Sequence, residues 1–231
     1  MLLSNDCFLT GTCKKANECI SEGGNVFCQK LFKMENLYSE SLLGKNQWKN
    51  IGLRYDADGT DKEEFDVLKS ISNDIENFVK EGKNLYIHSS ICGNGKTSWA
   101  IKLMQSYFNA IWHKCDFGCH GLYVNVPRYI IELKNSISNQ NDYISKIQEN
   151  ILSADLVIFD DIGTKTATQY EYDHLLSIIN GRIDYGKSCI YTSNMNNSEL
   201  AEKLGDRLYS RIINMSKNVE LKGIDKRGMN V

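Results

Sequence analysis

A glycine-rich turn at residues 90–97 places the strongest constraint on how this chain folds. Its sequence is "SICGNGKT". An apolar run, "NLYIHS", precedes the turn, and a helical pattern from Thr97 to Ile111 follows it. Gly93 and Gly95 allow backbone N–H groups to curve around an anion without Cβ clashes, and the following helix directs the positive end of its dipole to the same place. Strand, glycine turn and helix in this order predict a phosphate-binding loop.

The loop departs in one place from the pattern G-x-x-x-x-G-K-[ST], because Ser90 stands where the first glycine is expected. A serine fits there if its φ is negative. We expect Lys96 to reach the β- and γ-phosphates of a nucleotide and Thr97 to bind Mg²⁺. The competing interpretation is a glycine-rich turn beside a surface lysine. The residues predicted to contact the nucleotide are Ser90, Ile91, Cys92, Gly93, Asn94, Gly95, Lys96, Thr97 and Ser98.

Short apolar runs and helical patterns alternate along most of the chain. The runs expected to form strands are residues 84–89, 121–126, 156–160 and 188–193, with "VELKG" (219–223) as a further candidate. The segments expected to be helical are residues 61–82, 97–111, 128–153 in two pieces and 168–184, followed by two short helices. Such alternation predicts an α/β fold with a parallel sheet between helices and ligands at the carboxyl ends of the strands.

Two adjacent carboxylates end the third expected strand, in "LVIFDDIG". Packing does not explain Asp160 and Asp161, because charged groups resist burial. Asp160 is expected to hold Mg²⁺ through water, and Asp161 lies where a general base would activate the attacking water. A pair of acids that caps a helix is the competing interpretation.

Two later motifs extend this pattern. Asn194 follows the fourth expected strand, in "YTSN", where its amide can orient the hydrolytic water, although such a sequence also suits a simple turn. Arg207 and Arg211 are four residues apart and therefore lie on one helix face. An arginine that neutralises phosphoryl charge can come from a neighbouring subunit. A solvated basic face is the alternative.

In this order, the motifs resemble those of AAA+ ATPases of the DnaC/DnaI type, the replicative helicase loaders of bacteria and phages. The resemblance covers roughly residues 50 to 231 and rests on "GNGKTSWA", "LVIFDDIGT", "IYTSN", "LGDRLYSRI" and "VELKGIDKR". It implies a P-loop AAA+ core that binds ATP and Mg²⁺. It also implies that the protein binds a replicative hexameric DNA helicase and helps to place it on single-stranded DNA, with ATP hydrolysis as an assembly switch.

The same resemblance implies roles for single residues. Asn194 corresponds to the sensor residue, and Arg211, with Arg207 beside it, to the arginine finger that acts on a neighbouring copy of the protein. Asp161 replaces the glutamate usual in AAA+ proteins, although an Asp pair is common in this subgroup. Since Ser90 also departs from the pattern and the chain ends soon after Arg227, we expect slow turnover and little or no C-terminal lid.

Eight cysteines are present, and half of them crowd the first 28 residues. We expect a cytoplasmic protein with reduced thiols, because neither a transmembrane-length segment nor a signal peptide is recognisable. Four thiolates can bind one Zn²⁺, an iron–sulfur cluster uses the same ligand set, and unliganded cysteines are the third interpretation. The predicted division is a Cys-rich partner-binding module at residues 1–45 and an AAA+ ATPase domain at residues 46–231. The candidate zinc ligands are Cys7, Cys13, Cys19 and Cys28.

With a net charge of −2 over 231 residues, the protein has no overall positive charge that would attract nucleic acid. Any contact with nucleic acid therefore needs a local basic surface. "PRYIIELKNS" brings together Arg128, Tyr129 and Lys134, and Lys165 follows the Asp pair. Cations beside a stacking aromatic ring suit single-stranded nucleic acid. A partly solvated helix explains the same residues.

Two other classes of function fit parts of the sequence. A transposition-helper ATPase of the IstB type has nearly the same core but acts on duplex DNA and a transposase. A small-molecule kinase needs a mobile lid with several arginines between the third strand and the carboxyl end. Residues 162–200 contain a single arginine, Arg182. A nucleotide-binding adaptor without hydrolysis is supported only by Ser90.

Overall fold

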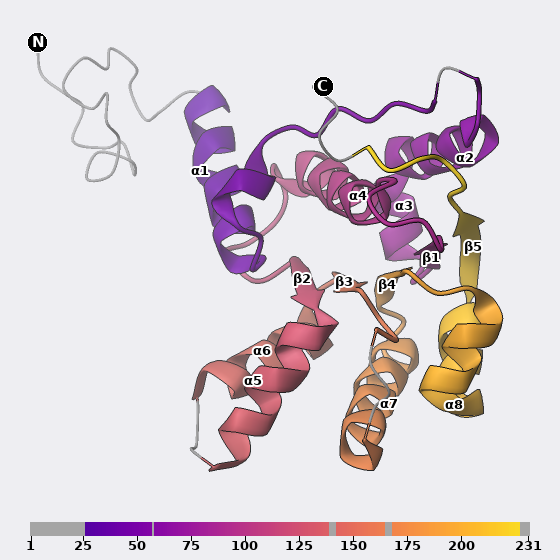
Figure 1. Cartoon of the computed structure of the whole chain (residues 1–231). Coiled ribbons are helices and arrows are strands. Elements are labelled where there is room, and N and C mark those ends of the chain that lie inside the picture. The colour runs from indigo at the N-terminus through magenta and orange to yellow at the C-terminus, as the bar shows by residue number, and fades with distance from the viewer. Residues whose placement is uncertain (1–25, 57, 139–141, 165–167, 227–231) are drawn as a thin grey trace, which may run out of the picture.

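The computed structural model describes residues 26–56, 58–138, 142–164 and 168–226. Its centre is a sheet of five strands in the order β2-β3-β4-β1-β5, and every neighbouring pair is parallel (Figure 1). The predicted parallel α/β fold is therefore confirmed. The strands are β1 (Asn84–His88), β2 (Gly121–Asn125), β3 (Leu156–Asp160), β4 (Ser188–Ser193) and β5 (Ser216–Glu220).

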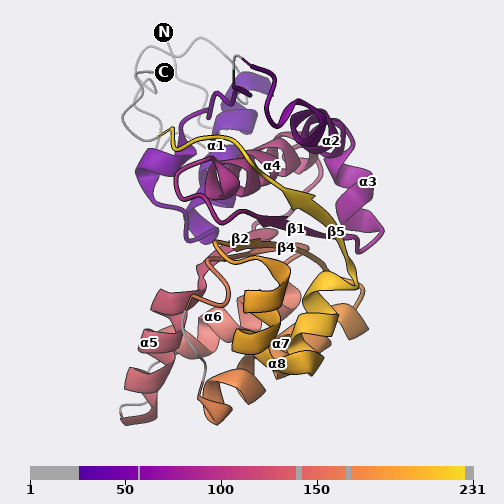
Figure 2. The same cartoon turned by 45° about the vertical axis from the view of Figure 1, so that its right-hand side comes forward.

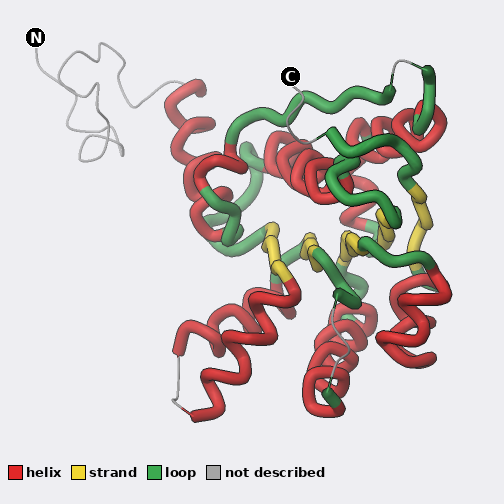
Figure 3. Tube along the Cα trace, viewed as in Figure 1, coloured by secondary structure: helices red, strands yellow, loops and turns green. Residues whose placement is uncertain are grey.

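Helices cover both faces of this sheet. In Figures 1 and 2, α1 to α4 lie on one face and α5 to α8 on the other, and Figure 3 shows the strands as a thin layer between them. The α-helices are α1 (Val26–Glu40), α2 (Lys62–Asn73), α3 (Ile75–Lys80), α4 (Lys96–Ile111), α5 (Val126–Ser138), α6 (Asp142–Ser153), α7 (Gln169–Asp184) and α8 (Asn197–Ile213), and a 3-10 helix, η2, spans Lys45–Trp48.

Each side of the sheet has its own apolar core. Alternate side chains of β1 point to opposite faces, so that Leu85 and Ile87 join the core beneath α4, while Tyr86 joins the core beneath α7 and α8. Strands β1, β3 and β4 are buried along their whole length, which explains why continuous apolar runs predicted them. No helix among the described residues has the length and apolar character needed to cross a bilayer.

Besides shifts of one or two residues at several element ends, three differences from the sequence prediction stand out. The helix expected over residues 61–82 is divided into α2 and α3 at Asp74. The two short helices expected near the end of the chain form α8, which is kinked at Gly205, where φ is 70°. Strand β5 begins at Ser216, before the expected Val219. The apolar pattern did not reveal its first residues, because they are polar and this edge strand is largely solvent-exposed.

Helix α1 packs on the face of the sheet that α4 covers. Leu37 and Leu43 are buried in the same core as α4, and the rings of Tyr38 and Phe108 meet edge to face with centroids 5.3 Å apart. The division after residue 45 stays a prediction, because residues 1–25 lie outside the described part of the chain.

The predicted zinc site also stays a prediction. Cys7, Cys13 and Cys19 lie outside the described residues, and Cys28 is on α1. Within the described ranges, no group of three or more His, Cys, Asp or Glu side chains is arranged to hold a metal ion.

Arg182 on α7 is completely buried. Its guanidinium donates to the carbonyl oxygens of Ile151 and Ala154 at the end of α6, and to that of Ser188 at the start of β4 (2.6 Å). This arginine therefore joins α6, α7 and β4 and is not part of an arginine-bearing lid.

Candidate functional site

The phosphate loop, residues 90–97, connects β1 to α4. Gly93 has φ 77° and Gly95 has φ 107°, values that glycine adopts readily and other residues rarely do. Ser90 is exposed and does not have a positive φ, which satisfies the condition under which serine can replace the first glycine. The loop thus has the backbone conformation that its glycines predict.

The ammonium group of Lys96 lies within the loop. The side chain is buried, and Nζ donates to the carbonyl oxygen of Ile91 (2.8 Å) and to Oδ1 of Asn94 (3.3 Å). The Asn94 amide in turn donates to Ser89 Oγ (2.6 Å). A cation enclosed by loop backbone is suited to binding phosphate oxygens.

Asp160 is joined to the phosphate loop. Thr97 Oγ1 donates to Asp160 Oδ1 over 2.8 Å, and Thr192 Oγ1 donates to the same oxygen over 2.7 Å. A third hydroxyl, that of Tyr123, donates to Asp160 Oδ2 over 2.6 Å. The carboxylate is buried, with 2% of its residue surface exposed. A hydroxyl and a carboxylate in contact are hard oxygen ligands, so this pair fits Mg²⁺.

The second acid pairs with the strand-end amide. Asn194 Nδ2 donates to Asp161 Oδ1 over 2.9 Å, and the backbone N–H of Asp161 donates to Thr192 Oγ1 over 3.0 Å. Cys92 Sγ lies 4.0 Å from Asn194 Oδ1, which places Asn194 beside the phosphate loop. The structure therefore brings together the loop, the Asp pair and Asn194, while their roles in catalysis stay predictions.

Arg207 and Arg211 lie elsewhere. Both are exposed on α8, which covers the opposite face of the sheet from α4 (Figures 1 and 2). Arg211 Nη1 lies 3.9 Å from Met215 Sδ. The hydrogen bonds and ion pairs of the described residues join neither arginine to the phosphate loop of its own chain.

Residues 221–226, here called the C-terminal strap, complete the site in a way that the sequence did not reveal. The N–H of Lys226 donates to the carbonyl oxygen of Gly93 (3.0 Å), and the amide of Asn94 donates to that of Leu221 (3.1 Å). A Cβ on Gly93 would lie only 1.8 Å from Asp225 Oδ1, so a larger residue there would displace that side chain, and the φ of 77° independently favours glycine.

Two acids that precede α2 hold this strap. Asp61 accepts from the N–H groups of Lys222 (2.6 Å) and Gly223 (2.7 Å), and Asp56 accepts from that of Ile224 (3.1 Å). Asp61 directly precedes α2, but its side chain makes no cap hydrogen bond to that helix. Its carboxylate is used by the strap instead.

The expected nucleic-acid residues on α5 differ in accessibility. Arg128 is exposed and pairs with Glu132 (2.8 Å), whereas Lys134 pairs with Glu171 (2.8 Å). Tyr129 is buried, and its hydroxyl lies 2.7 Å from His174 Nε2. Tyr129 is therefore not an exposed stacking platform, and Lys165 lies outside the described residues.

The family model for IstB-like ATP binding protein matches residues 46–228. Among solved structures, the DnaC helicase loader superposes with a TM-score of 0.64 at 19% identity, covering 78% of this chain and 100% of that one. DnaI gives a TM-score of 0.60 at 19% identity, with 81% of this chain and 95% of that chain covered.

The replication initiator DnaA, bound to AMPPCP and single-stranded DNA, gives a TM-score of 0.58 at 17% identity and covers 78% of this chain and 51% of its own. A comparison with curated proteins gave no match. Because these identities are below 20%, the solved structures show only that the fold is shared. Membership of the family rests on the family model, which matches the sequence over residues 46–228. With the phosphate loop and the parallel sheet in place, the chain belongs to the family of IstB-like ATP-binding proteins.

Proposed function

We propose that this protein is an ATPase that helps to load a replicative hexameric helicase onto single-stranded DNA, with hydrolysis as a slow, assembly-dependent switch. The observation that carries the ATPase part is the contact between Thr97 Oγ1 and Asp160 Oδ1, 2.8 Å apart, because it joins the phosphate loop to the carboxylate of β3. In phosphate-loop ATPases these two groups hold Mg²⁺ beside the β- and γ-phosphates.

Each residue of the site has a separate task in this proposal. Lys96 binds the phosphate oxygens, and Mg²⁺, when bound by Thr97 and Asp160, supplies further positive charge to them. Asp161 accepts a proton from the attacking water, and the amide of Asn194 holds the Asp161 carboxylate through the 2.9 Å hydrogen bond.

Helicase loading is supported by the structural neighbours. The DnaC structure is described as a helicase loader, and DnaA was solved with single-stranded DNA. In our proposal, the partners of this chain are a hexameric helicase, single-stranded DNA and neighbouring copies of the chain itself.

A transposition-helper ATPase is the second candidate, favoured by the IstB-like family match over residues 46–228. A small-molecule kinase is disfavoured, because Arg182, the arginine of residues 162–200, is buried between α6 and β4 and cannot serve in a lid. Co-purification separates the first two functions, since a loader retains a hexameric helicase and a transposition helper retains a transposase.

The ATPase proposal is tested by Lys96→Ala. Removing the ammonium group should weaken binding of MgATP by at least about tenfold, since hydrogen bonds to charged groups each contribute about 1.5–3 kcal/mol. Titration with a fluorescent ATP analogue measures the affinity, and circular dichroism checks that the fold is kept. Equal affinity for wild type and variant would place the nucleotide elsewhere.

We also propose that residues 1–45 contact the helicase and are stabilised by one Zn²⁺ on Cys7, Cys13, Cys19 and Cys28. Protein purified under reducing conditions without chelator should contain about one zinc ion per chain. Metal analysis that finds no zinc and no iron would remove this proposal.

A further inference from the structure

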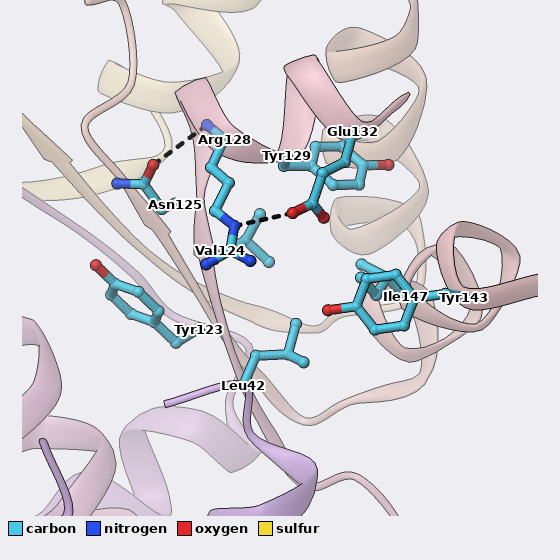
Figure 4. A pocket seen from close by; sticks show the side chains of 9 residues that line it. All are labelled: Leu42, Tyr123, Val124, Asn125, Arg128, Tyr129, Glu132, Tyr143 and Ile147. Atoms are coloured by element: carbon cyan, nitrogen blue, oxygen red, sulfur yellow. Dashed lines mark hydrogen bonds and ion pairs between the residues drawn. The ribbon is translucent and has the colours of Figure 1, made fainter. Parts of the chain in front are cut away.

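The two sides of the candidate site are held by different parts of the chain. On the metal side, Asp160 is held from within the sheet: the hydroxyl of Tyr123, which lines the cleft drawn in Figure 4, donates to Oδ2, and that of Thr192 donates to Oδ1. On the phosphate side, Lys96 is held in part by Asn94, a loop residue with only 3% of its surface exposed. The partners of Asn94 therefore influence where the ammonium group lies.

The carboxamide of Asn94 is fixed in one orientation. Oδ1 accepts from Lys96 Nζ (3.3 Å), while Nδ2 donates to Ser89 Oγ (2.6 Å) and to the carbonyl oxygen of Leu221 (3.1 Å). A flipped amide would turn Nδ2 towards the ammonium group and Oδ1 towards the Leu221 carbonyl, so donor would meet donor and acceptor would meet acceptor. The C-terminal strap, which begins at Leu221, thus keeps Oδ1 directed at Lys96.

The strap follows the phosphate loop from its entry to its middle. The N–H of Leu221 donates to the carbonyl oxygen of His88 at the end of β1 (2.9 Å), and the N–H of Lys226 donates to that of Gly93 (3.0 Å). Between these two points, the N–H groups of residues 222–224 bond to the carboxylates that precede α2. The position of the strap on the loop is therefore set from outside the loop.

Asp61 is the strongest of these anchors. It is largely buried, and its two oxygens accept from the consecutive N–H groups of Lys222 (2.6 Å) and Gly223 (2.7 Å). Charge-assisted hydrogen bonds of this kind are short and strong, and two of them fix the orientation of a peptide. Asp61 has φ 65°, a conformation that asparagine also tolerates. Asp61→Asn therefore changes the anchor and keeps the backbone conformation.

We propose that Asp61 is a positioning residue of the ATPase site, which acts on Lys96 through the strap and the Asn94 amide, and that docking of the strap is coupled to nucleotide binding. With the strap docked, the ammonium group is held in the loop before the phosphates arrive, so less ordering is needed on binding. Linkage then requires that nucleotide stabilises the docked strap by the same factor. This inference rests on the proposed ATPase and adds a regulatory segment outside the phosphate loop.

The first test measures the affinity of Asp61→Asn and Asp58→Asn for a fluorescent ATP analogue with Mg²⁺. Asp58 is exposed, and its carboxylate accepts from the N–H of Thr60 (2.9 Å) and not from the strap, so this control removes the same charge. Asp61→Asn should weaken binding at least about fivefold, and Asp58→Asn should match wild type. Equal affinity in Asp61→Asn and wild type overturns the positioning role.

A double-mutant cycle distinguishes positioning from a general loss of stability. Asn94→Ala removes the amide through which the strap acts, so adding Asp61→Asn to it should change the affinity by less than about twofold. A general weakening of the fold would lower the affinity equally in both backgrounds. Additive losses in the double variant would therefore contradict the relay to Lys96, and circular dichroism checks the fold of each variant.

Hydrogen exchange tests the coupling in the other direction and needs only the wild-type chain. The MgATP analogue should slow exchange of the N–H groups of residues 222–224 at least about fivefold. These groups bond to Asp61 and Asp56, not to the phosphate loop, so slower exchange reports docking of the strap. Exchange that does not respond to bound analogue would rule out the coupling.

These outcomes separate the two proposals. If wild type fails to bind the ATP analogue, the ATPase proposal fails, and this inference fails with it. If wild type and Asp58→Asn bind the analogue and Lys96→Ala does not, while Asp61→Asn matches wild type in affinity and in exchange, only the role of Asp61 fails.

Discussion

Asp161 has φ 59°, a left-handed conformation that few residues besides glycine, asparagine and aspartate tolerate. Such backbone strain is often kept where a side chain must be aimed at a reaction. Here it directs the carboxylate to Asn194, one strand away. The conformation is thus consistent with a base that has to be held at a fixed angle.

Asp161→Asn is expected to separate binding from hydrolysis. Asparagine accepts the same φ and can still accept the hydrogen bond from Asn194, so stability should change by less than about 1 kcal/mol. Loss of the general base should lower the turnover number by about 10²- to 10⁴-fold with little change in MgATP affinity. Phosphate release measured beside nucleotide titration checks both, and undiminished hydrolysis would exclude Asp161 as the base.

Arg182→Met is expected to destabilise the fold strongly. The substitution removes a buried cation but leaves the carbonyl oxygens of Ile151, Ala154 and Ser188 without their donor. The free energy of unfolding should fall by about 3–5 kcal/mol, as measured by urea denaturation. Arg128→Met, which removes an exposed arginine paired with Glu132, should cost less than about 0.5 kcal/mol. Similar losses in both variants would contradict the structural role of Arg182.

At the scale of elements, His120 directly precedes β2 and ties the start of that strand to two carboxylates. Its Nδ1 lies 2.9 Å from Asp155 Oδ2, and its Nε2 lies 2.8 Å from Asp116 Oδ1. Lys187 and the Tyr107 hydroxyl also contact Asp155. The hydrogen bond with Asp155 is the main cause that raises the pKa of His120, whereas the pKa of Asp155 falls to about 2, because its hydrogen bonds and charges outweigh the opposing effect of burial.

Stability should therefore depend on pH through His120. Because its pKa is raised on folding, the imidazolium stabilises the protein fully below the unfolded pKa of about 6.5, and this contribution is lost as pH rises through the folded pKa. Asp155 stays ionised throughout that window. The difference in free energy of unfolding between wild type and His120→Gln should be on the order of 1 kcal/mol near pH 5.5 and shrink towards pH 8.5.

Urea denaturation across this range measures that difference. The pKa values of His88 and His174 are lowered by burial, but both residues are present in each protein, so their effects cancel in the comparison. A difference that stays constant with pH, or grows with it, would contradict the ion pairs of His120.

At the scale of the whole molecule, Arg207 and Arg211 are exposed on α8 and apart from their own phosphate loop. If Arg211 acts on a neighbouring copy, Arg211→Ala should keep ATP binding and lose the assembly-dependent rate, a contribution on the order of 10³-fold in related chemistry. Mixing Arg211→Ala with Lys96→Ala chains should restore part of the ATPase activity, because each supplies what the other lacks. No recovery, with a wild-type rate independent of concentration and partners, would assign the arginines to a solvated face.

The sheet and most of the site could be predicted because they follow from local patterns. Buried parallel strands have continuous apolar runs, and their carboxyl ends meet at one edge, which brings Asp160, Asp161 and Asn194 to the phosphate loop. The structure joins Thr97 to Asp160, while their roles as magnesium ligands stay predictions from motif and position.

The remaining features depend on contacts between distant parts of the chain. Asp61 and Gly223 are 162 positions apart, and no periodicity indicates that a carboxylate before α2 binds the strap. Tyr123 looked like an ordinary strand residue, since its link to Asp160 depends on the register of β2 against β3. Tyr129 appeared exposed because the basic residues of α5 surround it, but the packed face of that helix includes it.

The place of β1 between β4 and β5 determines when the site can form during translation. The phosphate loop has been synthesised once translation has passed α4. The two strands that flank β1 are synthesised later, at residues 188–193 and 216–220. Gly93 acquires its contact with Lys226 later still. Competence to bind ATP is thus acquired after synthesis of the strap, and a chain terminated before β5 would lack a nucleotide site. We therefore expect such fragments to expose the part of the apolar core that Val219 and Leu221 cover in the full chain.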